Sequence, residues 1–103
     1  MKNKESKNQL NIELKDEISS GTYSNLVVIN HSPSEFVFDF ISVMPGLPKA
    51  KVNSRVILSP QHSKRLLRLL NENIKSFEDK NGKIKDLETR KLPLNFGGPK
   101  GQA

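Results

Sequence analysis

The side chains that could carry out chemistry in this 103-residue chain are few, and their spacing favours no reaction. His31 and His62 are the only histidines, and because neither HxxxH nor HExxH spacing occurs, we expect no metal site. The serines lack the context of a nucleophile elbow and of a catalytic triad. Glu35 and Asp39 in a strand would stand about 13 Å apart, too far for paired acid and base work, and we expect Asp39 to meet a lysine across the sheet. The sequence therefore predicts no catalytic residue, no cofactor and no small-molecule substrate, and we expect a protein that is not an enzyme.

Lysines and arginines are the remaining candidates, and they are distributed unevenly. Residues 10–44 carry one lysine against five acidic residues, whereas residues 49–75 carry seven basic residues against one glutamate. Cationic side chains neutralise phosphates without reading base sequence. We therefore predict a set that binds the backbone of single-stranded or double-stranded DNA or RNA, formed by Lys49, Lys51, Arg55, Lys64, Arg65, Arg68 and Lys75. Alternatively, the acidic and basic blocks attract each other between two subunits, or the basic block is an ordinary solvated surface.

Four strands and one helix are predicted to position these residues. Alternating or β-branched patterns indicate strands over residues 10–15, 23–30, 36–44 and 50–58. The SPSE motif could also cap a helix after Ser34, but aromatic residues at every second position, Phe36, Phe38 and Phe40, favour a strand. In the last strand, Lys49, Lys51 and Arg55 are expected along one side.

Residues 59–82 carry the clearest helical pattern. Ser59 is placed at the N-cap, Pro60 at the first helical position, and Asn81-Gly82 at a left-handed stop. Leucine, isoleucine and phenylalanine recur at spacings of three and four, which predicts an apolar stripe. The basic residues of this segment project from the opposite side.

The predicted fold is α+β: an antiparallel four-stranded meander followed by one long amphipathic helix laid over it, in the order ββββα. The strand at residues 36–44 is apolar on both sides, and one helix can cover only one of them. A surface of that size usually marks an interface. We therefore predict a homodimer whose interface includes Val37, Ile41, Val43, Leu70, Ile74 and Phe77.

The composition is that of one small domain with polar ends. We predict a domain over residues 10–87, a mobile N-terminal tail over residues 1–9 and a flexible C-terminal tail over residues 88–103. There is no cysteine, no apolar run long enough to cross a membrane and no hydrophobic signal core. These features favour a bacterial-style cytoplasmic protein.

The segments NHSPSEFVFDF and SRVILSPQHSKRLL carry a family resemblance. From Tyr23 to Gly82 the chain resembles a family of short bacterial proteins known only as a domain of unknown function, and this family implies no reaction, cofactor or substrate. A looser, topological similarity links the predicted ββββα order to the repeats of Pur-alpha and Whirly proteins, which implies dimerisation and binding of single-stranded nucleic acid. We expect a dimeric module that binds nucleic acid; the alternative is a protein–protein assembly module.

Overall fold

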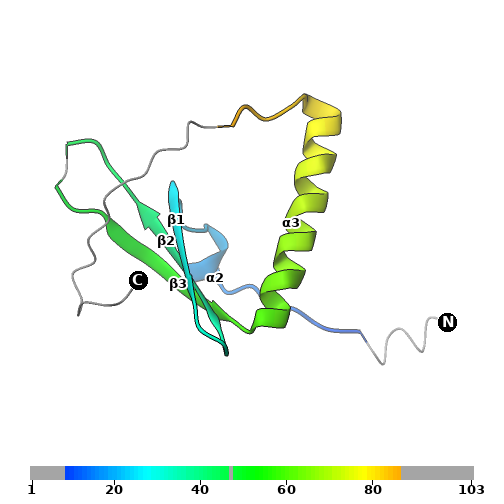
Figure 1. The fold of residues 1–103 in the computed structure, drawn as a ribbon, viewed down its shortest axis with the longest axis horizontal. Coiled ribbons are helices and arrows are strands. Elements are labelled where there is room, and N and C mark those ends of the chain that lie inside the picture. Colours follow the sequence, from blue (N-terminus) through cyan, green and yellow to red (C-terminus); the bar gives the residue numbers. More distant parts are fainter. Residues whose placement is uncertain (1–8, 47, 87–103) are drawn as a thin grey trace.

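The computed structural model describes residues 9–46 and 48–86. A short helix, α2 (Asp16–Ser19), precedes three strands, β1 (Leu26–His31), β2 (Phe36–Ser42) and β3 (Lys51–Leu58), and the long helix α3 (Pro60–Asn81) follows them. The predicted tails fall outside these residues, apart from Gln9, so their character stays a prediction. The fold is α+β, with one sheet and one long helix (Figure 1).

The strands form an antiparallel sheet in the order β1-β2-β3. Its centre is fixed by two registers, in which Phe38 pairs with Ile29 on one side and with Val56 on the other. A turn joins β1 to β2, where the Ser32 N–H donates to the Glu35 carbonyl at 2.9 Å. The three strands predicted from Tyr23 onward are thereby confirmed, with ends shifted by up to three residues.

The prediction of four strands is wrong. Residues 10–15 form no helix or strand and pair with no strand among the described residues, and the four residues of α2 follow them. Alternation shows that a segment can be a strand, but a strand also needs a neighbour to accept its backbone hydrogen bonds. Without the fourth strand, the similarity to the Pur-alpha and Whirly repeat order is lost as well.

Helix α3 forms as predicted. The Ser59 Oγ accepts the His62 N–H at 3.1 Å, Pro60 begins the first turn, and Gly82 ends the helix with a φ of 93°, a conformation that favours glycine. Its position, however, differs from the prediction. Only Ser59 separates it from β3, it contacts the sheet mainly through that strand, and none of its residues is buried. It therefore diverges from the sheet instead of lying over it (Figure 1).

The small core lies in β2. Phe38 and Ile41 are the buried hydrophobic residues, and Asp39 between them is fully buried. Burial is concentrated in β2 because this central strand has a neighbour on each edge. Residues of β1 alternate between half-buried and exposed, and those of β3 are mostly exposed.

Candidate interaction surfaces

One side of α3 carries an exposed apolar surface, which we call the α3 stripe: Leu66, Leu67, Leu69, Leu70, Ile74 and Phe77. These side chains are between 38% and 57% exposed, so the stripe is open over its whole length. A helix of this amphipathic type ordinarily places such a stripe against a core. Among the residues that the structure describes, no core covers it.

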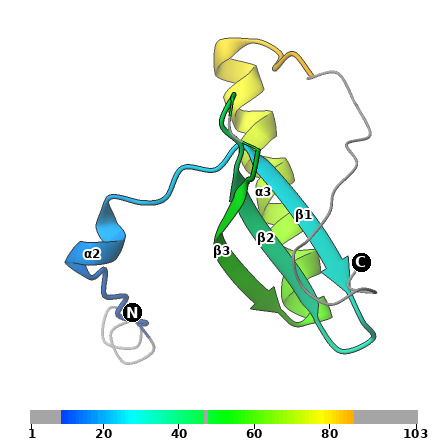
Figure 2. The same cartoon turned by 90° about the vertical axis from the view of Figure 1, so that its left-hand side faces the viewer.

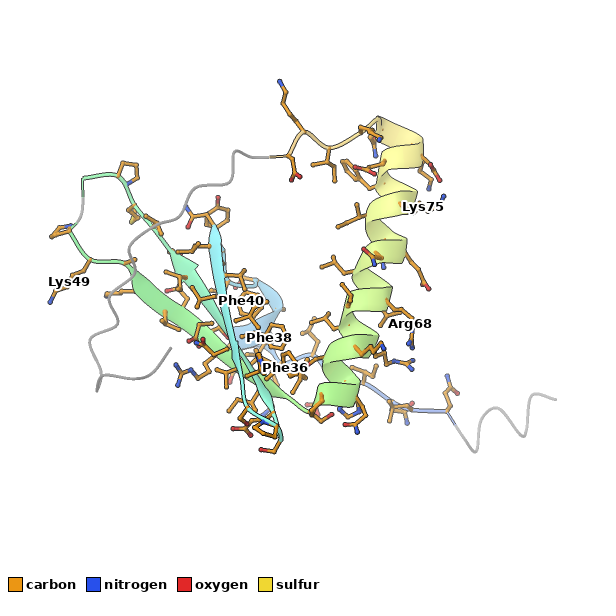
Figure 3. The ribbon with its side chains drawn as sticks, viewed as in Figure 1. Phe36, Phe38, Phe40, Lys49, Arg68 and Lys75 are labelled. Atoms are coloured by element: carbon orange, nitrogen blue, oxygen red, sulfur yellow. The ribbon has the colours of Figure 1, made fainter. Side chains whose placement is uncertain are left out.

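The sheet presents a second apolar surface toward α3. The register places Val27, Ile29 and Val56 beside the three phenylalanines of β2, and we call this set the phenylalanine face. Figure 3 shows Phe36, Phe38 and Phe40 on the side of β2 nearer to α3. Phe38 is buried, but Val27, Ile29 and Val56 are 40–53% exposed. Two apolar surfaces of one chain thus lie on either side of the Ser59 junction without covering each other.

The predicted dimer residues divide into two groups. Leu70, Ile74 and Phe77 belong to the α3 stripe and are exposed, as an interface requires. On the sheet, Ile41 is only 5% exposed, so it is already buried within one chain. Val37 is half-buried, and Val43 lies beyond the end of β2 and is exposed. Ile41 therefore has almost no surface to offer a partner.

Four basic residues of α3 lie on the side of the helix opposite the stripe. Lys64, Arg65, Arg68 and Lys75 are all exposed, and we call them the basic ridge. Arg68 and Lys75 point away from the sheet (Figure 3). Among residues 9–46 and 48–86, the one ion pair is formed elsewhere, so the ridge cations face solvent.

The basic residues around β3 are not gathered on one side as predicted. The pairing of β2 with β3 shifts between Phe40 and Ile41: Ser54 pairs with Phe40 but Val52 pairs with Ile41, which leaves Asn53 as the extra residue of a β-bulge. Residues of β3 before and after Asn53 therefore do not follow one continuous alternation between the two sides of the sheet. Lys51, paired with Ser42, shares the side of the phenylalanines, whereas Arg55, paired with Asp39, lies on the other side. Lys49 is exposed in the preceding loop.

Arg55 is committed to an ion pair inside the chain. Its Nε and Nη2 donate to the two carboxylate oxygens of Asp39 at 2.7 and 2.9 Å. These hydrogen bonds, with the charge of the guanidinium, hold the pKa of Asp39 below its usual value, although desolvation opposes the shift. The same bonds raise the pKa of Arg55. The Asp39 side chain is fully buried and the Arg55 side chain is 57% exposed, so solvent reaches the pair from the Arg55 side.

Sequence reasoning missed this pair because it expected a lysine opposite Asp39. Which residue faces Asp39 depends on the register between the strands. The signal that could have indicated the pair is an aspartate in an apolar strand, Asp39, with a single arginine in the strand that follows it, Arg55. A second contact was also missed, since the rings of His31 and Phe36 stack with centroids 5.1 Å apart. His62 contributes its backbone N–H to the cap of α3.

Within the described ranges, no group of three histidine or carboxylate side chains is placed to hold a metal ion. None of the helices in these ranges is both long and apolar enough to cross a membrane. What remains in this part of the chain is a pair of open apolar surfaces and a basic ridge.

Comparison with known proteins identifies a family. Residues 1–86 match the family described as a protein of unknown function, DUF3467. The chain belongs to this family. The resemblance predicted from the two sequence segments is thereby confirmed, and the match extends over the whole sheet and α3 of this DUF3467 protein. No curated protein and no solved structure matches the chain.

Proposed function

We propose that this DUF3467 protein is a non-enzymatic cytoplasmic module that works by self-association, in which the α3 stripe and the phenylalanine face are buried against a second copy. One observation carries the proposal: a 22-residue amphipathic helix has no buried residue of its own. Isolated helices gain most of their stability from packing an apolar side. A second copy supplies that packing.

The size of the open apolar surface supports this assignment. Nine large side chains, six on the stripe and three on the phenylalanine face, are about half exposed. Completing the burial of each contributes about 1 kcal/mol, so two copies together gain on the order of 18 kcal/mol. The cost of association is about 4–15 kcal/mol. The gain is thus large enough to hold two copies together.

The distribution of charge favours a second copy of this chain as the partner. Every copy presents the same two apolar surfaces, which is what a two-fold symmetric interface needs. Because the basic ridge lies opposite the stripe, two copies can bring their stripes together while Arg68 and Lys75 stay in solvent. Repulsion between like charges then does not oppose the contact.

Sedimentation of matched charge variants tests this proposal. Leu70→Asp with Phe77→Asp places charges on the stripe and should convert the protein to a monomer. Arg68→Asp with Lys75→Asp makes the same number of substitutions on the opposite side of α3 and should leave the dimer intact. A wild-type protein that sediments as a compact monomer at tens of micromolar would contradict the proposal.

The basic ridge favours a second candidate function, binding of nucleic-acid backbones. Lys64, Arg65 and Arg68 are clustered in the first turns of α3, close to the positive end of its dipole, and form no ion pair among the described residues. Glu72 and Asp79 project from the same side and reduce the charge toward the end of the helix. The binding set is therefore smaller than the one predicted from the sequence, and it excludes Arg55.

Titration of a labelled single-stranded oligonucleotide at several salt concentrations tests this second function. Each phosphate neutralised contributes about −0.7 to the slope of log K against log salt concentration. Arg65→Gln with Arg68→Gln should therefore reduce the magnitude of the slope by about 1.4 for every oligonucleotide sequence. Gln61→Ala on the same helix is the control and should leave the slope unchanged. Absence of binding at low salt would exclude this function and leave self-association in place.

A further inference from the structure

The segment just before α2, residues 10–15, has the pattern of a strand but pairs with no strand in the part of the chain that the structure describes. Leu10, Ile12 and Leu14 alternate with polar residues, lie outside any helix or strand and are 65–85% exposed. Such a segment leaves both apolar side chains and backbone hydrogen-bonding groups in water. A sheet edge is the surface that satisfies both at once, because it offers unpaired N–H and C=O groups beside apolar side chains.

The chain leaves the sheet at the edge formed by β3. The Tyr23 carbonyl accepts hydrogen bonds from Ser42 Oγ of β2 and Asn53 Nδ2 of β3, so the chain that precedes β1 crosses the end of the sheet toward β3. Figure 2 shows α2 on the β3 side of the sheet and well away from it. The segment before α2 thus projects outward beyond β3 instead of returning to it.

The charges of the two sheet edges differ, and this difference selects one of them. β1 (Leu26–His31) contains no lysine, arginine or carboxylate, whereas β3 contains Lys51 and follows Lys49, in addition to Arg55, which is paired with Asp39. The projecting segment and the start of α2 together carry three acidic residues, Glu13, Asp16 and Glu17, against Lys15. Opposite charges across neighbouring strands are stabilising. The β3 edge is therefore the electrostatic match for this segment.

One helical turn and a glycine separate the segment from the sheet of its own chain. The Lys15 carbonyl accepts hydrogen bonds from the N–H groups of Ile18 and Ser19. The Gly21 N–H donates to the Ile18 carbonyl, and Gly21 itself has a positive φ of 79°. We propose that residues 10–15 add as an outer strand to the β3 edge of a second copy, and that the second copy does the same in return. This exchange rests on the self-association proposed above, and it names a contact separate from the α3 stripe.

Cross-linking between different copies tests the exchange, because the chain contains no cysteine. Asn11→Cys and Ile57→Cys proteins carrying different tags are mixed, equilibrated and treated with a short bismaleimide reagent. A covalent heterodimer between the two tags is the expected product. Pairing Asn11→Cys with Asn30→Cys, in the same cross-strand row on the opposite edge, is the control and should give none.

Two results would overturn the exchange. In the first, the mixed single variants form no link, and a protein that carries both Asn11→Cys and Ile57→Cys forms only an intrachain link. This result would show that the segment pairs with its own sheet. Equal yields at β1 and β3 show that the segment has no specific edge. If sedimentation gives a dimer in either case, the exchange alone fails; if the protein is a monomer, the proposed function fails with it.

A charge reversal tests the electrostatic part independently. Glu13→Lys or Lys51→Glu alone should lower the cross-linking yield by about two- to five-fold at low salt, and the two reversals together should restore it. Glu35→Lys, in the turn between β1 and β2, is the matched control and should leave the yield unchanged. Failure of the double reversal to restore the yield would overturn the assignment of this edge.

Discussion

β2 and α3 use similar apolar residues with opposite results. In β2, Phe38 is 8% exposed because paired strands lie on both sides of it, whereas Phe77 in α3 is 50% exposed. Both segments are regular and both have apolar side chains at the spacing that suits them. The difference is that β2 has a paired strand on each side, whereas the described residues bury no side chain of α3. The sheet therefore buries its central strand by itself, whereas the apolar side of α3 stays exposed.

The strongest test of this comparison is truncation of the same residue type in the two regions. Phe38→Ala should cost about 3–5 kcal/mol of unfolding free energy, because it removes a buried ring from a small core. Phe77→Ala, measured in dilute protein by urea denaturation, should cost less than about 1 kcal/mol. Equal costs in dilute protein would show that α3 is packed within one chain.

Dependence of stability on protein concentration sharpens the comparison. If α3 is covered only in the dimer, the melting temperature should rise by about 3–5 °C for each tenfold increase in concentration, because association stabilises the folded state. The variant Leu70→Asp with Phe77→Asp is the control and should show a melting temperature independent of concentration. A flat wild-type curve by calorimetry would mean that the helix gains nothing from a second copy.

The Asp39–Arg55 pair makes the centre of the sheet sensitive to acid. Because folding lowers the pKa of Asp39, the pair stabilises the protein fully above the unfolded value of about 3.9, and this contribution is lost as the pH falls through the lower folded value. Asp39→Asn should remove that part of the pH dependence of the urea midpoint. Arg55→Met should lower the midpoint more at pH 7, because it leaves a buried carboxylate without its partner.

Asp79→Asn on the exposed side of α3 is the control for this pair. It should preserve the pH profile of the wild type, since Asp79 takes part in no ion pair among the described residues. An Asp39→Asn protein with an unchanged acid profile would show that the pair contributes nothing to the stability of the sheet.

Local features were predictable from the sequence, and long-range ones were not. Ser59, Pro60 and Gly82 act on their own neighbours, so the ends of α3 followed from residue types alone. The bulge that separates Lys51 from Arg55, and the register that joins Arg55 to Asp39, depend on how two strands align, which no local pattern records. Residues 10–15 show the same limit, because alternation cannot reveal whether a neighbouring strand exists. The basic ridge was predictable since it depends only on the period of one helix.

Ser59 joins the two regions, and its cap gives the smallest expected effect. Its Oγ accepts the His62 N–H, one of the N–H groups that the start of a helix leaves unsatisfied, so Ser59→Ala should cost about 1 kcal/mol. Because α3 has little packing in a single chain, the loss should appear as reduced helicity by circular dichroism in the monomeric Leu70→Asp, Phe77→Asp background. Ser76→Ala, in the middle of the same helix, is the control and should keep or slightly raise helicity, since alanine is the better helix former. If the two substitutions act alike, the start of α3 is held by its contact with β3 and not by its cap.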